Sequence, residues 1–168
     1  NVIVRLVDFK PIIPFPMTKQ QKPNMSAAVT LLTESEERNQ LLMTVIGDSM
    51  QVSDRKILLL SDRRQHCMDL NQMCEEKFGG DSCGLYMGGM KNDELKQNER
   101  KQIIIGTYSL AHEGLDIPSL DTIILATPKS NIIQAVGRIL RETTGKLNEP
   151  YVIDVVDHWG PIQYQFRK

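Results

Sequence analysis

The chain has 168 residues, of which 40% are hydrophobic and 24% are charged, and its formal net charge is −1. This length suits one domain with a full hydrophobic core, and the near-neutral charge neither indicates nor excludes a nucleic-acid partner. No apolar run approaches the length of a membrane span, so we expect a globular protein without a membrane partner.

The N-terminal segment, residues 1–24, is predicted to hold one strand and a proline-rich connector. Residues 2–9 alternate loosely between apolar and polar side chains, as a strand does. Residues 10–24 contain four prolines, Pro11, Pro14, Pro16 and Pro23, and these exclude a helix. Residues 25–168 are predicted to form the main domain. It begins with two helices after Ser26, the second capped by Thr33 or Ser35.

After a loop expected over residues 48–54, short apolar strands alternate with helices. Strands are predicted over residues 57–60, 83–87, 102–106, 122–126 and 151–156. Helices are predicted over residues 63–78, 92–98 and 131–141. Fully apolar strands that alternate with helices indicate a parallel sheet covered by helices on both faces. The predicted fold class is therefore α/β, as a single lobe.

The three cysteines, Cys67, Cys74 and Cys83, lack metal-ligand spacing, and their odd number argues against a disulfide framework. Cys67 and Cys74 fall in a helical pattern with apolar neighbours, which favours buried free thiols. We therefore expect a reducing, intracellular location, cytoplasm or nucleus, and assign no metal ligand to the side chains.

The run Gln134-Ala-Val-Gly-Arg-Ile-Leu-Arg141 places Arg138 and Arg141 three residues apart, among apolar residues that recur at helical spacing. Residues at i and i+3 share a helix face, so both guanidinium groups can meet one target. Two such forks suit a polyphosphate, and an arginine at a transferring phosphoryl group is a recurrent catalytic device. Taken alone, the same pattern also fits the solvated basic edge of an ordinary amphipathic helix.

Two ordered motifs connect this run to a known family. One segment resembles motif V of superfamily-2 helicases at Thr107, Ala111, Gly114, Asp116 and Pro118. The arginine run matches their motif VI at Gln134, Gly137, Arg138 and Arg141. Residues 57–64 resemble motif IV, and residues 86–90 resemble the phosphate-contacting loop after the next strand. The resemblance covers residues 40–157 and implies the C-terminal RecA-like lobe of such a helicase.

The resemblance implies a surface for ATP. Arg141 and Arg138 would stabilise charge on the γ-phosphate, with Gln134 holding that phosphate or the attacking water. Gly114 would allow close backbone approach, and Asp116 would reach the ribose hydroxyls or the metal-bound region. An aspartate before Ile-Pro also caps a turn, which remains an alternative for Asp116.

A second surface would line the track of one nucleic-acid strand, by contact with its phosphates. The residues that the resemblance implies for it follow predicted strands, where ligands meet a parallel sheet: Ser61, Arg63, Gly88, Gly89 and Thr107. A plain tight turn is the alternative for Gly88 and Gly89. The partner would be single-stranded or duplex nucleic acid, and DNA and RNA both remain open.

A phosphate-binding P-loop, G-x-x-x-x-G-K-[ST], is absent from the sequence. ATP and Mg²⁺ would therefore be bound mainly by an N-terminal RecA-like lobe of the same protein, and this chain alone should be inactive. The alternative function is a non-catalytic nucleic-acid-binding or partner-docking module that keeps the RecA-like fold.

The segment Ser61-Asp-Arg-Arg-Gln-His66 and the tail at residues 152–157 are similar to phage and large-DNA-virus helicases that act in transcript release or branch migration. For a viral member, the location would be a virus factory or the virion. The chain opens on Asn1 without a methionine and ends at Lys168, so we expect it to be a piece of a longer protein. No signal peptide is visible in the sequence.

Overall fold

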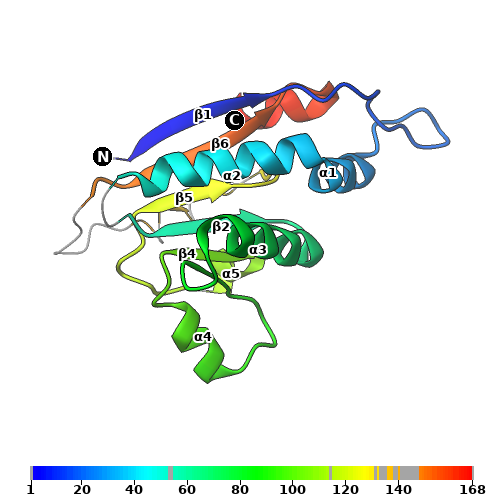
Figure 1. The fold of residues 1–168 in the computed structure, drawn as a ribbon. Coiled ribbons are helices and arrows are strands. Elements are labelled where there is room, and N and C mark those ends of the chain that lie inside the picture. The colour runs from blue at the N-terminus through cyan, green and yellow to red at the C-terminus, as the bar shows by residue number, and fades with distance from the viewer. Residues whose placement is uncertain are drawn as a thin grey trace.

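The computed structural model describes residues 2–52, 55–113, 115–130, 132, 136–137, 140 and 148–167, and its centre is one parallel sheet (Figure 1). The strands are β1 (Ile3–Phe9), β2 (Ile57–Ser61), β3 (Cys83–Leu85), β4 (Ile103–Thr107), β5 (Thr122–Leu125) and β6 (Tyr151–Asp157). In the described part of the chain they lie in the order β1-β6-β5-β2-β4-β3, and every neighbouring pair is parallel. The predicted α/β parallel sheet is confirmed.

Strand boundaries follow the apolar runs closely. The central strand β2 is buried along its whole length, as expected where helices cover both faces of a sheet. The edge strand β3 is shorter than the predicted 83–87 and ends at Leu85. The Tyr86 amide still donates to the Ile105 carbonyl at 2.8 Å, whereas the carbonyl of Leu85, on the open side of this edge strand, accepts a hydrogen bond from Asn98 Nδ2 at 2.7 Å.

The helices are α1 (Met25–Glu34), α2 (Glu36–Met50), α3 (Arg64–Phe78), α4 (Asn92–Asn98) and α5 (Tyr108–Glu113), with a 3₁₀ helix η1 (Gly160–Arg167). Ser35 caps α2 as predicted, since its Oγ accepts a hydrogen bond from the Arg38 amide at 3.3 Å. Gly79 ends α3 with a φ of 91°, a conformation that favours glycine. Among the described residues, no helix combines the length and apolarity needed to cross a membrane.

Three helical features differ from the predictions. The loop expected over residues 48–54 begins later, because α2 continues to Met50 with Ser49 buried and its Oγ donating to the Val45 carbonyl at 2.8 Å. Helix α5 was not predicted, and its six residues follow β4 directly. The 3₁₀ helix η1 was also not predicted.

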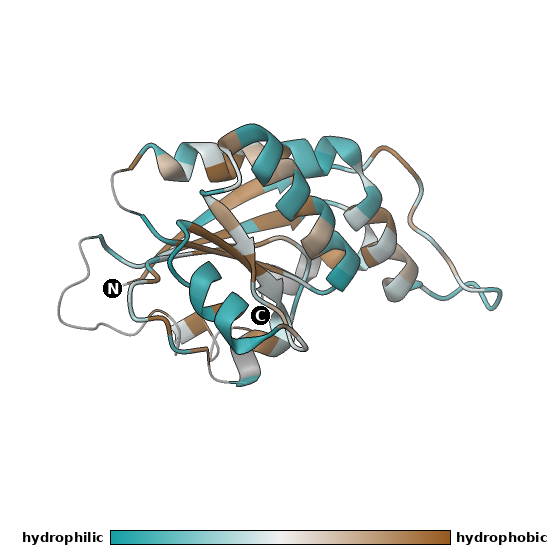
Figure 2. Ribbon diagram, turned by 60° about the horizontal axis from the view of Figure 1, so that its bottom comes forward, coloured by the Kyte–Doolittle hydropathy of each residue, from teal (hydrophilic) through white to brown (hydrophobic). Residues whose placement is uncertain are grey.

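Two apolar clusters lie on opposite faces of the sheet, and each draws alternate residues from the strands. On one face, α2 and α3 pack on Leu59 and Ile105. On the other face, α5 and the buried residues Ile132, Val136 and Leu140 pack on Leu58 and Ile104. Figure 2 shows hydrophobic strands enclosed by helices with hydrophilic outer sides. Helices on both faces are therefore confirmed.

Most of the predicted helix over residues 131–141 lies outside the described residues. Within the described part, the Val136 amide donates to the Ile132 carbonyl and the Leu140 amide donates to the Val136 carbonyl, both at 2.9 Å. These bonds have the i to i−4 pattern of an α-helix.

The strand in the N-terminal segment is part of the same sheet. β1 pairs with β6 over its full length, from Ile3 opposite Tyr151 to Phe9 opposite Asp157. Beyond β1, a small cluster of Ala28, Leu32, Trp159 and Ile162 joins α1 to the segment after β6.

A buried ion pair attaches α2 to the ends of β5 and β6. Arg38 and Asp157 are both fully buried, with Nε 2.7 Å from Oδ1 and Nη2 2.9 Å from Oδ2. Arg38 Nη1 also donates to the Ala126 carbonyl. Burial raises the pKa of the Asp157 carboxyl, while the charge and hydrogen bonds of Arg38 oppose that shift.

Next to this pair, His66 lies in a buried chain of hydrogen bonds. His66 Nε2 is 2.8 Å from Asn39 Oδ1, and His66 Nδ1 is 2.8 Å from Ser61 Oγ. The Asn39 carbonyl oxygen can only accept, so the neutral ring carries its proton on Nε2 and accepts from the Ser61 hydroxyl at Nδ1. Burial, reinforced by the charge of Arg38, lowers the pKa of His66 to about 3.

We predict that Arg38→Met lowers the free energy of unfolding by about 3–5 kcal/mol, because it leaves the Asp157 carboxylate buried without a partner. Urea denaturation measures the loss. The double variant Arg38→Met, Asp157→Leu should recover part of it, since both charged groups are then removed. A loss below about 1 kcal/mol in the single variant would contradict this account.

We predict that His66 makes the fold sensitive to mild acid. Its pKa in the folded state lies below its unfolded value, so the unfolded chain binds the proton more tightly and stability falls as the pH drops below about 6.5. Between neutral pH and about pH 5, this single group should remove about 2 kcal/mol. The control is His66→Gln, whose unfolding free energy should change less over the same interval. Equal pH dependence in the two proteins would exclude this role.

Candidate nucleic-acid and nucleotide interface

The carboxyl ends of the strands gather several predicted site residues at one edge of the sheet. Ser61 closes β2 and Thr107 closes β4, and the two are register partners. Gly88 and Gly89 follow β3, the next strand outward. Ligands of open parallel sheets bind at this edge, because the loops there can vary without disturbing the core.

A carboxylate at this edge holds two cations in place. Asp62 Oδ2 is 2.8 Å from Arg63 Nη1, and Asp62 Oδ1 is 3.0 Å from Lys129 Nζ. The Asp62 amide donates to Thr127 Oγ1 at 2.9 Å, which joins the loops after β2 and β5. All three charged side chains are partly exposed, so the group presents a net positive charge to solvent.

Arg63 and Lys129 have further contacts that fix their directions. Arg63 Nη2 donates to Ser26 Oγ at 3.2 Å, and Lys129 Nζ lies 5.4 Å from the centroid of the Tyr108 ring. Sequence reasoning found Arg63 but missed Lys129. The available signal was its position in the loop after β5, at the same edge as the other predicted site residues.

The glycine loop after β3 offers bare backbone to solvent. Gly88 and Gly89 are exposed, a Cβ on either would meet nothing, and Gly89 has a φ of 88°. Arg64 Nη1 donates to the Gly88 carbonyl at 3.1 Å, which ties this loop to the start of α3. Arg64 is thus a third cation at the edge, and it was not predicted.

Gly106 in β4 lets the segment after β3 pack closely against β4. A Cβ on Gly106 would lie 2.5 Å from the Tyr86 carbonyl oxygen, so a side chain there would push the loop outward. Next to Gly106, Thr107 Oγ1 is 2.7 Å from Ser109 Oγ, so two hydroxyl groups are hydrogen-bonded to each other at the end of β4.

The predicted site residue Ser61 lies at this edge with its side chain directed inwards. Its side chain is fully buried, and its Oγ is engaged by His66 Nδ1 and by the Arg63 amide, the latter at 3.2 Å. The hydroxyl therefore faces the interior rather than a bound strand. It orients the backbone of Arg63 instead.

Of the predicted nucleotide-binding residues, Asp116 lies in the described part of the chain and is exposed. Its neighbour Ile117 is buried and begins a turn in which the Leu120 amide donates to the Ile117 carbonyl at 3.0 Å. Gly137 of the arginine run is exposed, between buried Val136 and Leu140. The remaining predicted residues lie outside the described residues: Gly114, Gln134, Arg138 and Arg141.

The three cysteines are buried and free, as predicted. Burial raises the pKa of Cys67 to about 12, so its thiol stays protonated. Within the described ranges, no three His, Cys, Asp or Glu side chains are grouped as metal ligands.

Comparison with known proteins agrees with the motifs. The helicase conserved C-terminal domain matches residues 37–143. A putative ATP-dependent RNA helicase, L396 of Acanthamoeba polyphaga mimivirus, is 41% identical over 81% of this chain. The transcript termination protein A18 of Yaba-like disease virus is 30% identical over 69% of this chain. The chain spans 26% of the length of each relative.

Solved structures share the fold. T4 UvsW superimposes with a TM-score of 0.70 at 16% identity, over 93% of this chain and 32% of UvsW. The C-terminal domain of the DEAD-box protein Dbp5 gives a TM-score of 0.57 at 15% identity, over 79% of this chain and 75% of that domain. The predicted similarity to viral helicases is confirmed by the relatives, and the RecA-like fold is confirmed by these structures. Because the matched domain covers more than half of the sequence, the chain belongs to the helicase conserved C-terminal domain family, as the C-terminal lobe of a superfamily-2 helicase.

Proposed function

We propose that this chain supplies arginine fingers to ATP bound on an N-terminal lobe of the same protein and forms part of the track for one nucleic-acid strand. The observation that carries the proposal is that the family match, residues 37–143, contains the whole motif-VI run from Gln134 to Arg141. A module retained only for docking has no need of that set of residues. The full protein would then be an ATP-dependent helicase or translocase.

In this proposal, Arg141 and Arg138 stabilise negative charge on the γ-phosphate, and Gln134 holds that phosphate or its attacking water. Gly114 and Asp116 lie against the nucleotide. The exposure of Asp116 and Gly137, each beside buried apolar residues, supports a solvent-facing surface for these motifs. ATP and Mg²⁺ would be held mainly by the N-terminal lobe, since the chain has no P-loop.

The strand track would run along the carboxyl edge of the sheet. Arg63, Arg64 and Lys129 supply positive charge there, and Gly88, Gly89 and Thr107 supply backbone and hydroxyl groups for phosphates. Ser61 contributes by orienting Arg63. Contacts of this kind are made with the phosphate backbone, so binding would not depend on base sequence.

The names of the relatives suggest a biological setting. Because one similar protein is a viral transcript termination protein and another is a putative viral RNA helicase, we propose a role in transcription, on RNA or on DNA. The location would be intracellular, in the cytoplasm or nucleus, or in a virus factory or virion for a viral protein.

The decisive experiment is Arg141→Ala in the full-length protein. Loss of an arginine finger should reduce ATP turnover by about 10³-fold or more, with little change in nucleic-acid affinity. Arg141→Lys should restore little activity, because an ammonium group lacks the planar fork. In the isolated lobe, Arg141→Ala should change the free energy of unfolding by less than about 0.5 kcal/mol. Full turnover in the alanine variant would instead favour the non-catalytic module.

The strand track is tested by removing single cations from this chain. Lys129→Gln and Arg64→Gln should each weaken single-strand binding for all sequences alike and reduce the slope of log affinity against log salt by about 0.7. Lys77→Gln is the matched control, because Lys77 is an exposed cation at the far end of α3 from Arg64. Fluorescence anisotropy with labelled oligonucleotides measures both quantities. An equal effect of all three substitutions would refute a localised track.

A further inference from the structure

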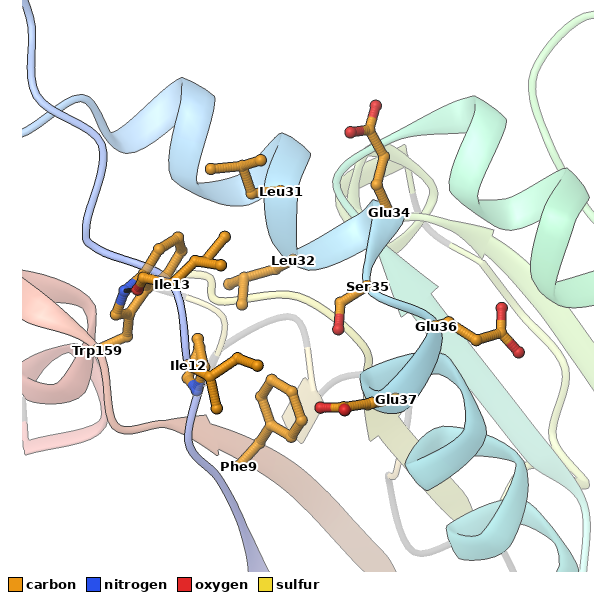
Figure 3. A pocket seen from close by; sticks show the side chains of 11 residues that line it. Phe9, Ile12, Ile13, Leu31, Leu32, Glu34, Ser35, Glu36, Glu37 and Trp159 are labelled. Atoms are coloured by element: carbon orange, nitrogen blue, oxygen red, sulfur yellow. Dashed lines mark hydrogen bonds between the residues drawn. The ribbon is translucent and has the colours of Figure 1, made fainter.

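A second candidate site lies where β1 and β6 end, and the residues that line it do not include the cations described above. It is a pocket of about 350 Å³ with apolar walls from Phe9, Ile12, Ile13, Leu31, Leu32 and Trp159. Three carboxylates, Glu34, Glu36 and Glu37, stand at its rim, at the junction of α1 and α2 (Figure 3). We call it the acidic-rimmed pocket.

One wall of the acidic-rimmed pocket is held in place by contacts of Trp159, and other apolar side chains of the pocket are exposed to solvent. Trp159 Nε1 donates to the Ile13 carbonyl at 2.8 Å, and the Trp159 ring meets the Phe15 ring edge-on at a centroid distance of 4.9 Å. Nevertheless, Ile12 is 88% exposed and Ile13 is 45% exposed. A partner that covered these side chains would remove apolar surface from water without first having to order the indole that forms one wall.

The side chains at the rim of the pocket are negatively charged. The lining residues include three glutamates and no lysine or arginine. Glu36 and Glu37 stand in the first turn of α2, so the helix fixes their positions. In Figure 3 the Glu37 carboxylate points towards Phe9, whereas Glu34 and Glu36 point away from the apolar side chains. Such a rim repels phosphates and attracts cations, so it is unsuited to nucleic acid.

We propose that the acidic-rimmed pocket docks a segment of a partner protein that inserts an apolar side chain and carries a lysine or arginine beside it. The apolar walls would hold the anchor residue, and the glutamates would select the flanking cation. A tryptophan beside aliphatic side chains is typical of the centre of a protein interface. This proposal is independent of the role of the lobe in ATP hydrolysis.

The test begins with a display library of random dodecapeptides selected on the 168-residue chain. We expect the enriched peptides to share an apolar residue next to Lys or Arg. Trp159 is the only tryptophan of the chain, so its fluorescence reports binding of a selected peptide directly. A selected peptide in which the basic residues are replaced by glutamate should bind at least tenfold more weakly.

Two exposed positions keep the test separate from folding. Ile12→Ser should weaken binding about tenfold, because it removes apolar contact area. Glu37→Gln should weaken it about two- to fivefold at low salt, as for a charge at an interface rim. Glu94→Gln, on the exposed acidic turn of α4, is the control and should bind as the unchanged chain does.

Three results would overturn the proposal: enrichment of peptides without basic residues, binding that Ile12→Ser leaves unchanged, or no enrichment. Sedimentation velocity tests whether a second copy of this chain occupies the pocket. Self-association that Ile12→Ser abolishes would assign the pocket to a second copy of this chain.

Discussion

The arrangement of this lobe depends on one buried guanidinium. Arg38 reaches from α2 to the Asp157 carboxylate at the end of β6 and to the Ala126 carbonyl just after β5. An ion inside a core must have its hydrogen-bonding capacity met, so these partners fix the angle at which α2 lies on the sheet. The chain of Asn39, His66 and Ser61 then carries that fixed geometry to the end of β2. The carboxyl edge of the sheet therefore rests on a hydrogen-bonded polar interior.

At the carboxyl edge of the sheet, cationic and anionic side chains lie in different regions. Over β2, β4 and β5 the loops expose Arg63, Arg64 and Lys129, with Asp62 holding two of them. Beyond the ends of β1 and β6, the charged side chains that line the pocket are carboxylates. Because the strand order places β1 and β6 on one side of β5, β2 and β4, one edge presents two neighbouring surfaces with opposite preferences for ligands.

Sequence reasoning succeeded where a local pattern decides the outcome. Continuous apolar runs located the strands to within a few residues, and helix α4 was predicted at its observed bounds. The sequence did not predict features that depend on contacts between residues far apart in the chain. Arginine is seldom fully buried, so Arg38 gave no sign of its role until β6 supplied Asp157. The inward turn of Ser61 likewise depends on His66, and the position of Lys129 depends on Asp62 across two loops. The arginine run was recognised through the family motif, and its geometry stays a prediction.

The pairing of β1 with β6 has a consequence for how the chain folds. The first strand of the sheet lies beside the last, with Ile3 opposite Tyr151. Strand β1 can therefore pair only after β6 has been made. Contacts between such distant residues carry a large loop-closure entropy and are characteristic of slow folding. During synthesis on the ribosome, β1 is made before the other strands of this sheet, so its apolar residues Val4 and Leu6 lie on a strand without a paired neighbour until β6 has been made. The lobe is thus most exposed to aggregation when the segments that resemble motifs V and VI have been made but β6 has not.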